Sequence, residues 1–484
     1  MQKVALIFPN YILREKFGNP SDQPLGIGYI ASELEARGHK VKIIDANADN
    51  LSMEDIVSII FEFKPNIIGI SCNYSPLHNS TLSLSRILKR KINVPIVIGG
   101  NHASALAEYI LNQSNSIDIV IRGEGEEIMP KVVEWLENKK NIEDIFGISY
   151  KKSDKIYSNP DAPLIENLDS LPFPAYHLLP MEKYSRYNII TSRGCPYNCS
   201  YCASNIIFKQ KVRHRNPEKV VDEIEFLYKK YGNKYFWFSD DTFTSDTKYL
   251  DKLLDEIIKR GLSIKWSCVT RVNLVSKDLL QKMKKAGCDY ISYGVESGNE
   301  KILSEINKKI SIIQIKEALE LTKKADIRTF TFFLVGNPNE TWETIKDSYK
   351  LITEIKPDGA SFAVVIPLPG TKMCKDLMAR ELINYGDIKW DYLFAKIPGS
   401  KYEEYAADLA SKWCKLSPTE LIKACKIGEA LPHIIKLHKE FENIFSFAED
   451  NLSKIYDEKL TKEIPEKQIF FDTLKIYINL LNGS

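Results

Sequence analysis

The stretch T-S-R-G-C-P-Y-N-C-S-Y-C-A-S, residues 191–204, decides how the rest of the chain is interpreted. It carries three cysteines, Cys195, Cys199 and Cys202, in the spacing C-x3-C-x2-C. Three thiolates on one short loop can bind three corners of an iron–sulfur cube and leave the fourth iron open for another ligand. The glycine and proline beside the first cysteine favour a turn over a helix. The stretch therefore predicts a metal-binding loop.

Two simpler interpretations are a structural zinc site and three unrelated cysteines. A structural zinc ion normally takes four ligands in two separated pairs, such as C-x2-C followed later by C-x2-C. No second pair of this kind is visible in the sequence, and Cys374, Cys414 and Cys425 are too widely spaced to predict a second cluster. The spacing therefore favours one iron–sulfur cluster.

With Tyr201 directly before its last cysteine, the motif resembles the signature of the radical SAM superfamily. The resemblance implies that the three cysteines hold a 4Fe–4S cluster. It also implies that S-adenosylmethionine (SAM) chelates the open iron through its amino and carboxylate groups. The reduced cluster would then split SAM into methionine and a 5′-deoxyadenosyl radical, with Tyr201 at the SAM site.

Composition narrows the class of protein. The 484 residues suffice for roughly three domains, and 66 basic against 64 acidic residues give a net charge of +2, so no global attraction to nucleic acid is expected. No apolar run approaches the ~18 residues of a membrane helix, and the N-terminus lacks a signal-peptide layout. Nine irregularly spaced cysteines argue against a disulfide framework. We expect a cytoplasmic protein without a membrane span.

The N-terminal third alternates short β-branched runs with amphipathic stretches, which predicts a Rossmann-like, doubly wound parallel sheet. Ligands on such sheets bind beyond the carboxyl ends of the strands. The loops there read S-C-N-Y-S-P (71–76), G-G-N-H-A-S (99–104) and R-G-E-G-E (122–126). Strands are predicted at 3–8, 40–45, 66–71, 94–98 and 118–121, and helices near 25–38, 53–63, 78–90, 102–113 and 125–138.

The order of these loops upstream of the cysteine motif resembles the cobalamin-binding domain of cobalamin-dependent radical SAM enzymes. The resemblance implies that the corrin lies over the strand ends and that the nucleotide tail threads into the fold. The D-x-H-x-x-G motif that supplies a lower cobalt ligand is absent, which fits a histidine-off mode or a domain that has lost cobalamin. The implied cobalamin contacts are Ser71, Asn73, Gly99, Gly100, Asn101, His102, Gly123 and Glu124.

Two side chains near these loops have plainer interpretations. His102 could face the corrin or simply begin the helix after Gly100. Cys72 is interpreted as a small buried residue and not as a cobalt ligand.

Residues 141–187, with a short strand pair at 147–157 and four prolines from Pro163 to Pro180, predict an extended connector.

The β–α rhythm returns at residue 188, and its six steps suit the open (β/α)6 barrel that the resemblance implies. Catalytic groups in barrels lie at the carboxyl ends of the strands. Strands are predicted near 188–192, 234–239, 264–270, 289–295, 328–335 and 359–366, with helices near 217–231, 247–260, 276–286, 311–325 and 340–355.

Polar residues follow the second, third and fourth of these strands. Carboxylates suit an ammonium group and ribose hydroxyls, and a guanidinium suits a carboxylate. The resemblance therefore implies SAM contacts for Asp240, Asp241, Arg271, Glu296 and Ser297. One of the two aspartates is expected only to cap the next helix. Arg271 could alternatively form a surface ion pair.

Other segments carry weaker signals. The basic run R-H-R at 213–215, with Lys209 and Lys211, could attract an anionic substrate or a reductant, although a solvated face is the simpler interpretation. Beyond residue 371 helices are expected near 371–382, 402–413, 419–444 and 466–482, with Pro432 kinking or splitting the third. The aromatic stretch 385–393 is expected to line or close the barrel mouth.

The predicted organisation is a cobalamin-binding domain (1–140), a linker (141–187), a radical SAM barrel (188–370) and a helical substrate or capping region (371–484). The resemblance implies methylation of an unactivated carbon through methylcobalamin and a 5′-deoxyadenosyl radical. The partners would be a small-molecule or lipid-like substrate and a flavodoxin- or ferredoxin-type reductant.

Three alternatives remain open at this stage. The first is a cobalamin-dependent cyclase or rearrangement enzyme without net methyl transfer, and the second is a radical SAM enzyme whose N-terminal domain no longer binds cobalamin. The third is a methylthiotransferase, against which the N-terminal third offers only Cys72, where a second cluster needs three cysteines. A carrier or sensor without catalysis is disfavoured by the cysteine motif and the polar strand ends.

Overall fold

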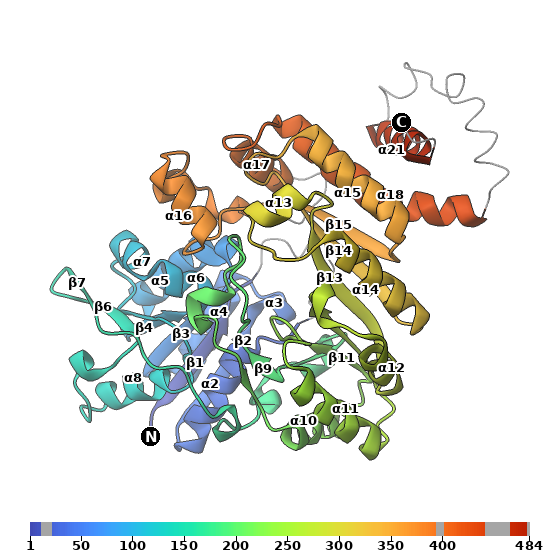
Figure 1. Cartoon of the computed structure of the whole chain (residues 1–484). Helices are drawn as coiled ribbons and strands as arrows, with labels where there is room; N and C mark the ends of the chain where they lie inside the picture. Colours follow the sequence, from blue (N-terminus) through green and yellow to red (C-terminus); the bar gives the residue numbers. More distant parts are fainter. Residues whose placement is uncertain (11–21, 394–400, 441–464, 482–484) are drawn as a thin grey trace.

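The computed structural model describes residues 1–10, 22–393, 401–440 and 465–481. Two sheets, the first mostly and the second wholly parallel, lie side by side with covering helices, and helices of the C-terminal region pack over the second sheet (Figure 1). The predicted α/β class with a helical C-terminal region is confirmed. Within the described ranges, no helix combines the length and apolar character needed to cross a membrane.

The N-terminal sheet has the strand order β2-β1-β3-β4-β5-β6-β7 among the described residues. Its first five strands are parallel and short, and most of their residues are buried, as expected for a sheet covered on both faces. The strands are β1 (Lys3–Phe8), β2 (Lys40–Asp45), β3 (Ile67–Ser71), β4 (Ile96–Gly99), β5 (Ile119–Ile121), β6 (Ile148–Lys152) and β7 (Lys155–Ser158).

The strand pair expected in the connector instead extends this sheet. β6 pairs antiparallel with β5, and β7 pairs antiparallel with β6. The pair covers the edge of the very short strand β5, which would otherwise expose unpaired backbone groups. The loop after β5 is thereby held between β4 and a hairpin, close to the connector.

Helices cover both faces of this sheet. Ser52 and Asp55 form a capping box that starts α4 at the predicted residue. The helix expected at 102–113 is divided at Leu106 into α6 and α7. The helices are α2 (Leu25–Ala36), α3 (Ala46–Asp49), α4 (Met53–Phe63), the 3-10 turn η1 (Ser75–Leu77), α5 (His78–Lys91), α6 (Asn101–Ala105), α7 (Ala107–Gln113) and α8 (Ile128–Leu136), with a 3-10 turn η2 (Ile142–Asp144) before β6.

The proline-rich connector fastens the two sheets to each other. The hydroxyl group of Tyr184 donates to Asp45 at the end of β2, and the hydroxyl group of Tyr176 donates to Glu223 on barrel helix α10 (Pro217–Tyr231; 2.6 Å). Both tyrosines are buried. The connector contains the 3-10 turns η3 (Leu168–Ser170), η4 (Tyr176–Leu178) and η5 (Met181–Lys183).

The second sheet has six parallel strands in the order β15-β14-β13-β12-β11-β8 within the described residues, in agreement with an open barrel. A separate two-stranded hairpin, β9 and β10, flanks the cysteine loop. The strands are β8 (Tyr187–Ile189), β9 (Ser192–Arg193), β10 (Arg213–His214), β11 (Tyr235–Phe238), β12 (Lys265–Thr270), β13 (Cys288–Glu296), β14 (Arg328–Val335) and β15 (Gly359–Val364).

The barrel helices largely begin and end as predicted. Helix α11 is capped by Asp246, so the expectation that Asp240 or Asp241 caps it is wrong. The short helix α13, which has only 6 residues and is capped by Asn299, was not predicted. The helices are α9 (Ser204–Phe208), α10 (Pro217–Tyr231), α11 (Thr247–Arg260), η6 (Val272–Leu274), α12 (Lys277–Lys285), α13 (Glu300–Glu305), α14 (Ile312–Lys324) and α15 (Trp342–Ile355).

The C-terminal helices cover β15 and the end of β14. Helix α18 runs through Pro432 without being divided, contrary to a split at this proline. The predicted extension to residue 444 lies partly outside the described residues. The elements are α16 (Lys372–Ala379), η7 (Tyr385–Asp387), η8 (Trp390–Tyr392), α17 (Lys401–Ala410), α18 (Pro418–Glu440) and α21 (Pro465–Leu481).

Trp413 and Glu340 tie the C-terminal region to the loop after β14. The indole of Trp413 donates to the carbonyl of Gly336 (2.8 Å), and the carboxylate of Glu340 accepts from the backbone N–H groups of Gly336 and Asn337. Burial raises the pKa of Glu340 to about 7, although these hydrogen bonds oppose the shift. The loop at the end of β14 is therefore fixed from two sides.

The aromatic stretch 385–393, expected to line or close the barrel mouth, packs against the N-terminal part of the chain. The ring of Trp390 lies 5.0 Å from that of His78 and 5.1 Å from that of His102, both in the N-terminal part of the chain. The carbonyl of Tyr385 accepts a hydrogen bond from Tyr109. An aromatic side chain gains more by filling a buried slot between two domains than by facing solvent at a rim.

Candidate functional site

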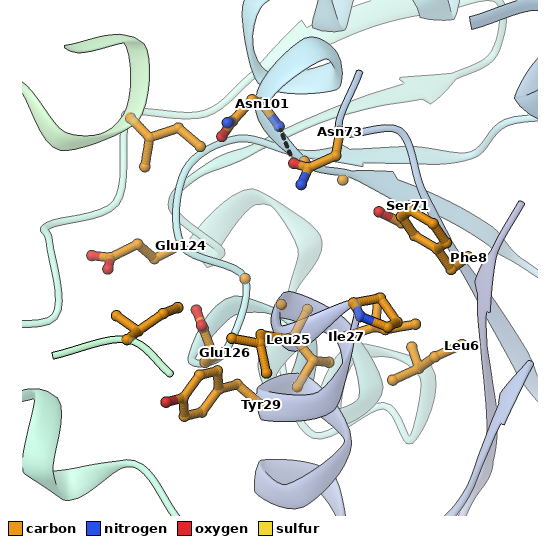
Figure 2. A pocket seen from close by; sticks show the side chains of 18 of the residues that line it. Leu6, Phe8, Leu25, Ile27, Tyr29, Ser71, Asn73, Asn101, Glu124 and Glu126 are labelled. Atoms are coloured by element: carbon orange, nitrogen blue, oxygen red, sulfur yellow. Dashed lines mark hydrogen bonds between the residues drawn. The ribbon is translucent and has the colours of Figure 1, made fainter. Parts of the chain in front are cut away.

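A cavity of about 1040 Å³ lies where the carboxyl ends of the N-terminal strands face the start of the barrel. This volume is at the upper end of the ~300–1,000 Å³ typical of small-molecule sites, so the space fits a large ligand. Figure 2 shows side chains of the N-terminal strands, α2 and the strand-end loops converging on it. On the barrel side it is lined by Asn188, Ile190, Ser192, Arg193, Ile207, Phe208, Trp237, Ser239 and Asp241.

The predicted cobalamin loops form the N-terminal wall of this cavity. Gly100 has φ +113°, and a Cβ atom there would come within 3.0 Å of Asn73. The side-chain oxygen of Asn73 accepts from the backbone N–H of Asn101 (3.0 Å; Figure 2). These glycine-rich loops keep the wall open to a large flat ligand. The predicted contacts that line the cavity are Ser71, Asn73, Gly99, Gly100, Asn101, Gly123 and Glu124.

His102 is the exception, because it lies outside the cavity lining. Its Nδ1 lies 3.1 Å from the hydroxyl of Ser75 and its Nε2 lies 2.9 Å from Nδ1 of His78. Both ring nitrogens are thus engaged in a buried chain, and burial lowers the pKa of His102 to about 3. Cys72 is also buried, as interpreted from the sequence. Among the described residues, no histidine lines the cavity.

The cysteine loop follows β9 at the top of the barrel. Cys195, Cys199 and Cys202 are free thiols on one turn of chain, so three thiolates are available to a cluster with one open corner. No three His, Cys, Asp or Glu side chains within the described ranges converge on a single metal ion. A cubane does not require such convergence, because each of its thiolates binds a different iron atom. The three cysteines therefore fit the expected cluster.

Neighbouring elements hold this loop in place. The backbone N–H of Ser200 donates to the carbonyl of Ile306 (3.0 Å), and its own carbonyl accepts from Met373 on α16 (2.8 Å). The sulfur of Cys195 lies 3.2 Å from the hydroxyl oxygen of Thr242. The loop is therefore supported by the chain after β11, the chain after α13 and the start of α16.

The two aspartates after β11 have different surroundings. The carboxylate of Asp240 is buried and accepts hydrogen bonds from the backbone and hydroxyl groups of Thr191 and Ser192, the residues that begin the cysteine stretch. Burial raises the pKa of Asp240 to about 6 against the effect of these donors. Asp241 is exposed and lines the cavity. Asp241 is therefore the better placed of the two for contact with a ligand.

Arg271 is buried beside the cysteine loop, so it does not form the surface ion pair considered from the sequence. Its guanidinium carbon lies 3.8 Å from the centre of the Tyr197 ring, and its Nη1 lies 3.5 Å from the sulfur of Cys199. Its Nη2 donates to the carbonyl of Lys308. A fixed positive charge at a cysteine sulfur favours an anionic cluster.

The buried side chains of Glu296 and Lys308 form a second group with the half-buried Tyr201 of the loop. Lys308 Nζ lies 2.7 Å from the carboxylate of Glu296, whose other neighbour is the hydroxyl of Tyr201 at 2.8 Å. Lys308 could not be singled out from the sequence, because I-N-K-K-I resembles an exposed turn. Ser297 is fully buried, and its hydroxyl accepts from the backbone of Asn299.

The basic run at 213–215 is not the solvated face that was the simpler interpretation. Arg213 and Arg215 are buried and form ion pairs with Glu124 (2.6 Å) and Glu223 (2.5 Å). Lys209 and Lys211 are exposed and pair with Asp161 and Glu166. A run of arginines looks solvated in sequence, whereas buried carboxylates distant along the chain allow it to enter the core.

Comparison with known proteins adds family identity to this geometry. The family model "Radical SAM superfamily" matches residues 189–352, and the "B12 binding domain" model matches residues 21–133. The chain is 34% identical to an uncharacterized methyltransferase of Pyrococcus horikoshii, over 87% of this chain and 94% of the relative. It is 33% identical to the anaerobic magnesium-protoporphyrin IX monomethyl ester cyclase of Rubrivivax gelatinosus, over 78% of this chain and 70% of that protein.

A solved structure has the same overall arrangement. The radical S-adenosylmethionine methyltransferase TsrM from Kitasatospora setae, with cobalamin and a 4Fe–4S cluster bound, superposes with a TM-score of 0.68. The superposition covers 89% of this chain and 85% of that chain at 18% sequence identity. At this identity the likeness concerns the fold.

Proposed function

The chain belongs to the cobalamin-binding branch of the radical SAM superfamily, and we propose that it methylates an unactivated carbon atom of a small molecule. It is an enzyme whose cofactors are a 4Fe–4S cluster, SAM and cobalamin. When bound, these groups supply a reactive carbon radical and a methyl group for transfer. Free thiols persist in the reducing environment of the cytoplasm, so the three unpaired cysteines of the loop suit a cytoplasmic setting.

One observation carries this proposal: a single cavity joins the cobalamin wall to the barrel. Gly100, Asn101 and Gly123 line it from the N-terminal sheet, and Asp241, Ser239 and Trp237 line it from the barrel. A substrate bound between these two walls would therefore face the strand ends of both sheets, where the two cofactors are expected.

We assign roles to the chain's own residues on this basis. Cys195, Cys199 and Cys202 hold the cluster, and Asp241 accepts a hydrogen bond from the amino group of SAM. Arg271 and the group formed by Glu296, Lys308 and Tyr201 contact its carboxylate and ribose regions, because a buried arginine and carboxylate beside the loop match those charges. Ser297 shapes the turn beneath them.

The barrel lumen supports an apolar or lipid-like substrate. Phe333 stacks on Phe362 at 4.5 Å, on the side covered by helices, so alternation along β14 turns Phe330 and Phe332 toward the lumen. Trp237 adds an aromatic wall where the lumen meets the cavity. These aromatic side chains favour a substrate with a large apolar surface.

The reductant would be a flavodoxin- or ferredoxin-type protein that docks over the cysteine loop. Pro196 and Asn198 in this loop are exposed, which gives an electron donor a short path to the cluster. Reduction of SAM-bound protein by such a donor, monitored by cleavage of SAM, would test this partner directly.

The primary experiment is anaerobic reconstitution with iron, sulfide and hydroxocobalamin, followed by gel filtration, an iron count and an absorption spectrum. Co-elution of about one cobalamin and about four irons per chain is expected. Incubation with methyl-labelled SAM and an extract of apolar metabolites should then yield a labelled product. Four irons without cobalamin would overturn the methyltransferase proposal.

A second candidate function is cyclisation or rearrangement without net methyl transfer. It is favoured by the identity to the magnesium-protoporphyrin cyclases, which are 33% and 31% identical over 78% of the chain. Product mass separates the two functions, since methylation adds one methyl group and an oxidative cyclisation removes hydrogen. A product lacking the label would favour the cyclase.

A further inference from the structure

A buried group of four charged residues joins the two halves of the molecule at the edge of the cavity. Arg193 on β9 bridges two carboxylates, with Nη1 2.7 Å from Glu124 and Nη2 2.7 Å from Glu126. Arg213 on β10 reaches the other oxygen of Glu124 at 2.6 Å. The four side chains are at most 9% exposed. We call Arg193, Arg213, Glu124 and Glu126 the interdomain clamp.

The clamp touches both parts of the site. Arg193 lies two positions before Cys195, and the intervening Gly194 has φ +92° in close contact with the backbone of Lys211. Because that glycine leaves no room for a side chain, the cysteine loop leaves the β9–β10 hairpin along one fixed path. On the other side, Gly123 to Glu126 line the cavity. The loop of residues 123–126 therefore contacts the hairpin that leads into the cysteine loop and also forms part of the wall assigned to cobalamin.

We propose that Glu124 and Glu126 are positioning residues, which set the place of the cluster loop relative to the cobalamin wall of the cavity. The inference rests on the proposed function in that both cofactors must use this cavity. The reaction requires two separately bound groups to face the same substrate carbon, and a displacement of ~1 Å in such a site can cost ~100-fold in rate. Carboxylates of one domain that hold the other domain's loop would satisfy this requirement.

Glu124 is poorly placed to bind a ligand directly. Its two carboxylate oxygens already accept from Arg193, Arg213 and the backbone N–H of Ile165. Little acceptor capacity is left for a ligand. The charged groups of the clamp are also costly to bury, and buried ion pairs are often no more stabilising than apolar contacts in their place. A fork of Arg193 between two carboxylates does, however, fix orientation in a way that an apolar contact cannot.

A matched control lies within the barrel. Arg260 of α11 forms ion pairs with Asp222 and Glu225 of α10 and with Glu256 of α11. Arg260→Lys makes the same substitution as Arg193→Lys, but all of these carboxylates lie on barrel helices. It should loosen α10 against α11 without moving the β9–β10 hairpin relative to the cobalamin wall.

The test begins with hydrogen exchange on the chain without cofactors. In Arg193→Lys, which keeps the charge but has one donor nitrogen in place of the fork, amides of residues 192–195 and 122–126 should exchange at least ~10-fold faster than in the wild type. Glu126→Gln should act in the same direction. Arg260→Lys should accelerate exchange in α10 and α11 and leave residues 122–126 unchanged. Wild-type exchange at both segments in Arg193→Lys and Glu126→Gln would overturn the proposal.

A spectroscopic measurement on reconstituted protein then separates positioning from mere stability. The reduced cluster and cob(II)alamin are both paramagnetic, so their magnetic interaction reports the separation between them. At unchanged iron and cobalamin content, Arg193→Lys and Glu126→Gln should weaken or broaden this interaction, whereas Arg260→Lys should retain it. An unchanged interaction in the two clamp variants would overturn the proposal. A wild-type interaction without any methylated product would instead count against the proposed function alone.

Discussion

The strand ends of the two sheets use side chains in opposite ways. At the barrel ends, Asp240 and Glu296 are buried and bonded to neighbours within the protein. At the N-terminal ends, Gly100 and Gly123 leave open backbone along a large cavity. A loop that carries metal ligands needs rigid support, whereas a large flat ligand needs space. Polar residues at a strand end are therefore more often supports than contacts in this molecule.

The largest effect should come from removing a cluster ligand. Cys195→Ala should abolish cluster binding, because two thiolates cannot hold the cube, and iron content after reconstitution should fall from about four per chain to near zero. Cys268→Ala is the matched control, since Cys268 is fully buried in β12 and serves packing. If Cys195→Ala retained a full complement of iron, the assignment of the barrel loop would fail.

The support role of Asp240 predicts a loss of stability. Asp240→Asn removes acceptor capacity from four buried donors and should lower the free energy of unfolding by about 2 kcal/mol. Asp241→Asn, on the exposed side chain, should change it by less than about 0.5 kcal/mol while weakening SAM binding. Denaturant unfolding and SAM titration measure the two effects. Equal destabilisation by both variants would show that Asp240 supports the fold no more than Asp241 does.

The open glycine wall predicts an effect on cobalamin alone. Gly100→Ala places a methyl group against Asn73 and should weaken cobalamin binding roughly tenfold without reducing iron content. Gly38→Ala is the control, because Gly38 also has a positive φ but no atom near its missing Cβ. Spectroscopic titration with hydroxocobalamin gives both affinities. Equal losses in the two variants would show that backbone strain, and not the shape of the wall, is responsible.

The smallest predicted effect concerns Glu340, which supports the loop at the end of β14. The folded state binds the proton of Glu340 more tightly than the unfolded chain, because its pKa is raised to about 7. The stability that this proton provides is present at low pH and is lost as the pH rises through about 7. Between about pH 6 and 7 the loss should be about 1 kcal/mol.

Glu340→Gln keeps the shape of the side chain and removes its titration. Unfolding by denaturant at several pH values should show a shallower fall in stability for this variant than for the wild type. Identical slopes would mean that Glu340 is already ionised in the folded protein at pH 6, and that its hydrogen bonds outweigh its burial.

Local patterns predicted much of the fold. Strands β1 and β2 and helix α4 begin and end at the predicted residues, because their apolar periodicity and caps are encoded within a few positions. Partners distant in sequence could not be predicted. The burial of Arg213 depends on Glu124, 89 residues away, and Trp390 fills a slot made by His78 and His102.

The site follows the same division. The cysteine triplet and the glycine loops were visible because their spacing and composition are unusual along the chain. The engaged rings of His102 and the buried ammonium of Lys308 were not, because each depends on which side chain folds against it. Role assignments for single polar residues therefore need three-dimensional context even when the motif around them is clear.

The docking of Trp390 onto the histidine pair has a consequence for biosynthesis. The N-terminal sheet leaves the ribosome well before Trp390, which follows His102 by about 290 residues, or roughly 15–60 s of synthesis at ~5–20 residues per second. During that time the slot over His78 and His102 lacks its aromatic cover. The packing of the N-terminal domain can therefore be completed only after just over four fifths of the chain has been translated.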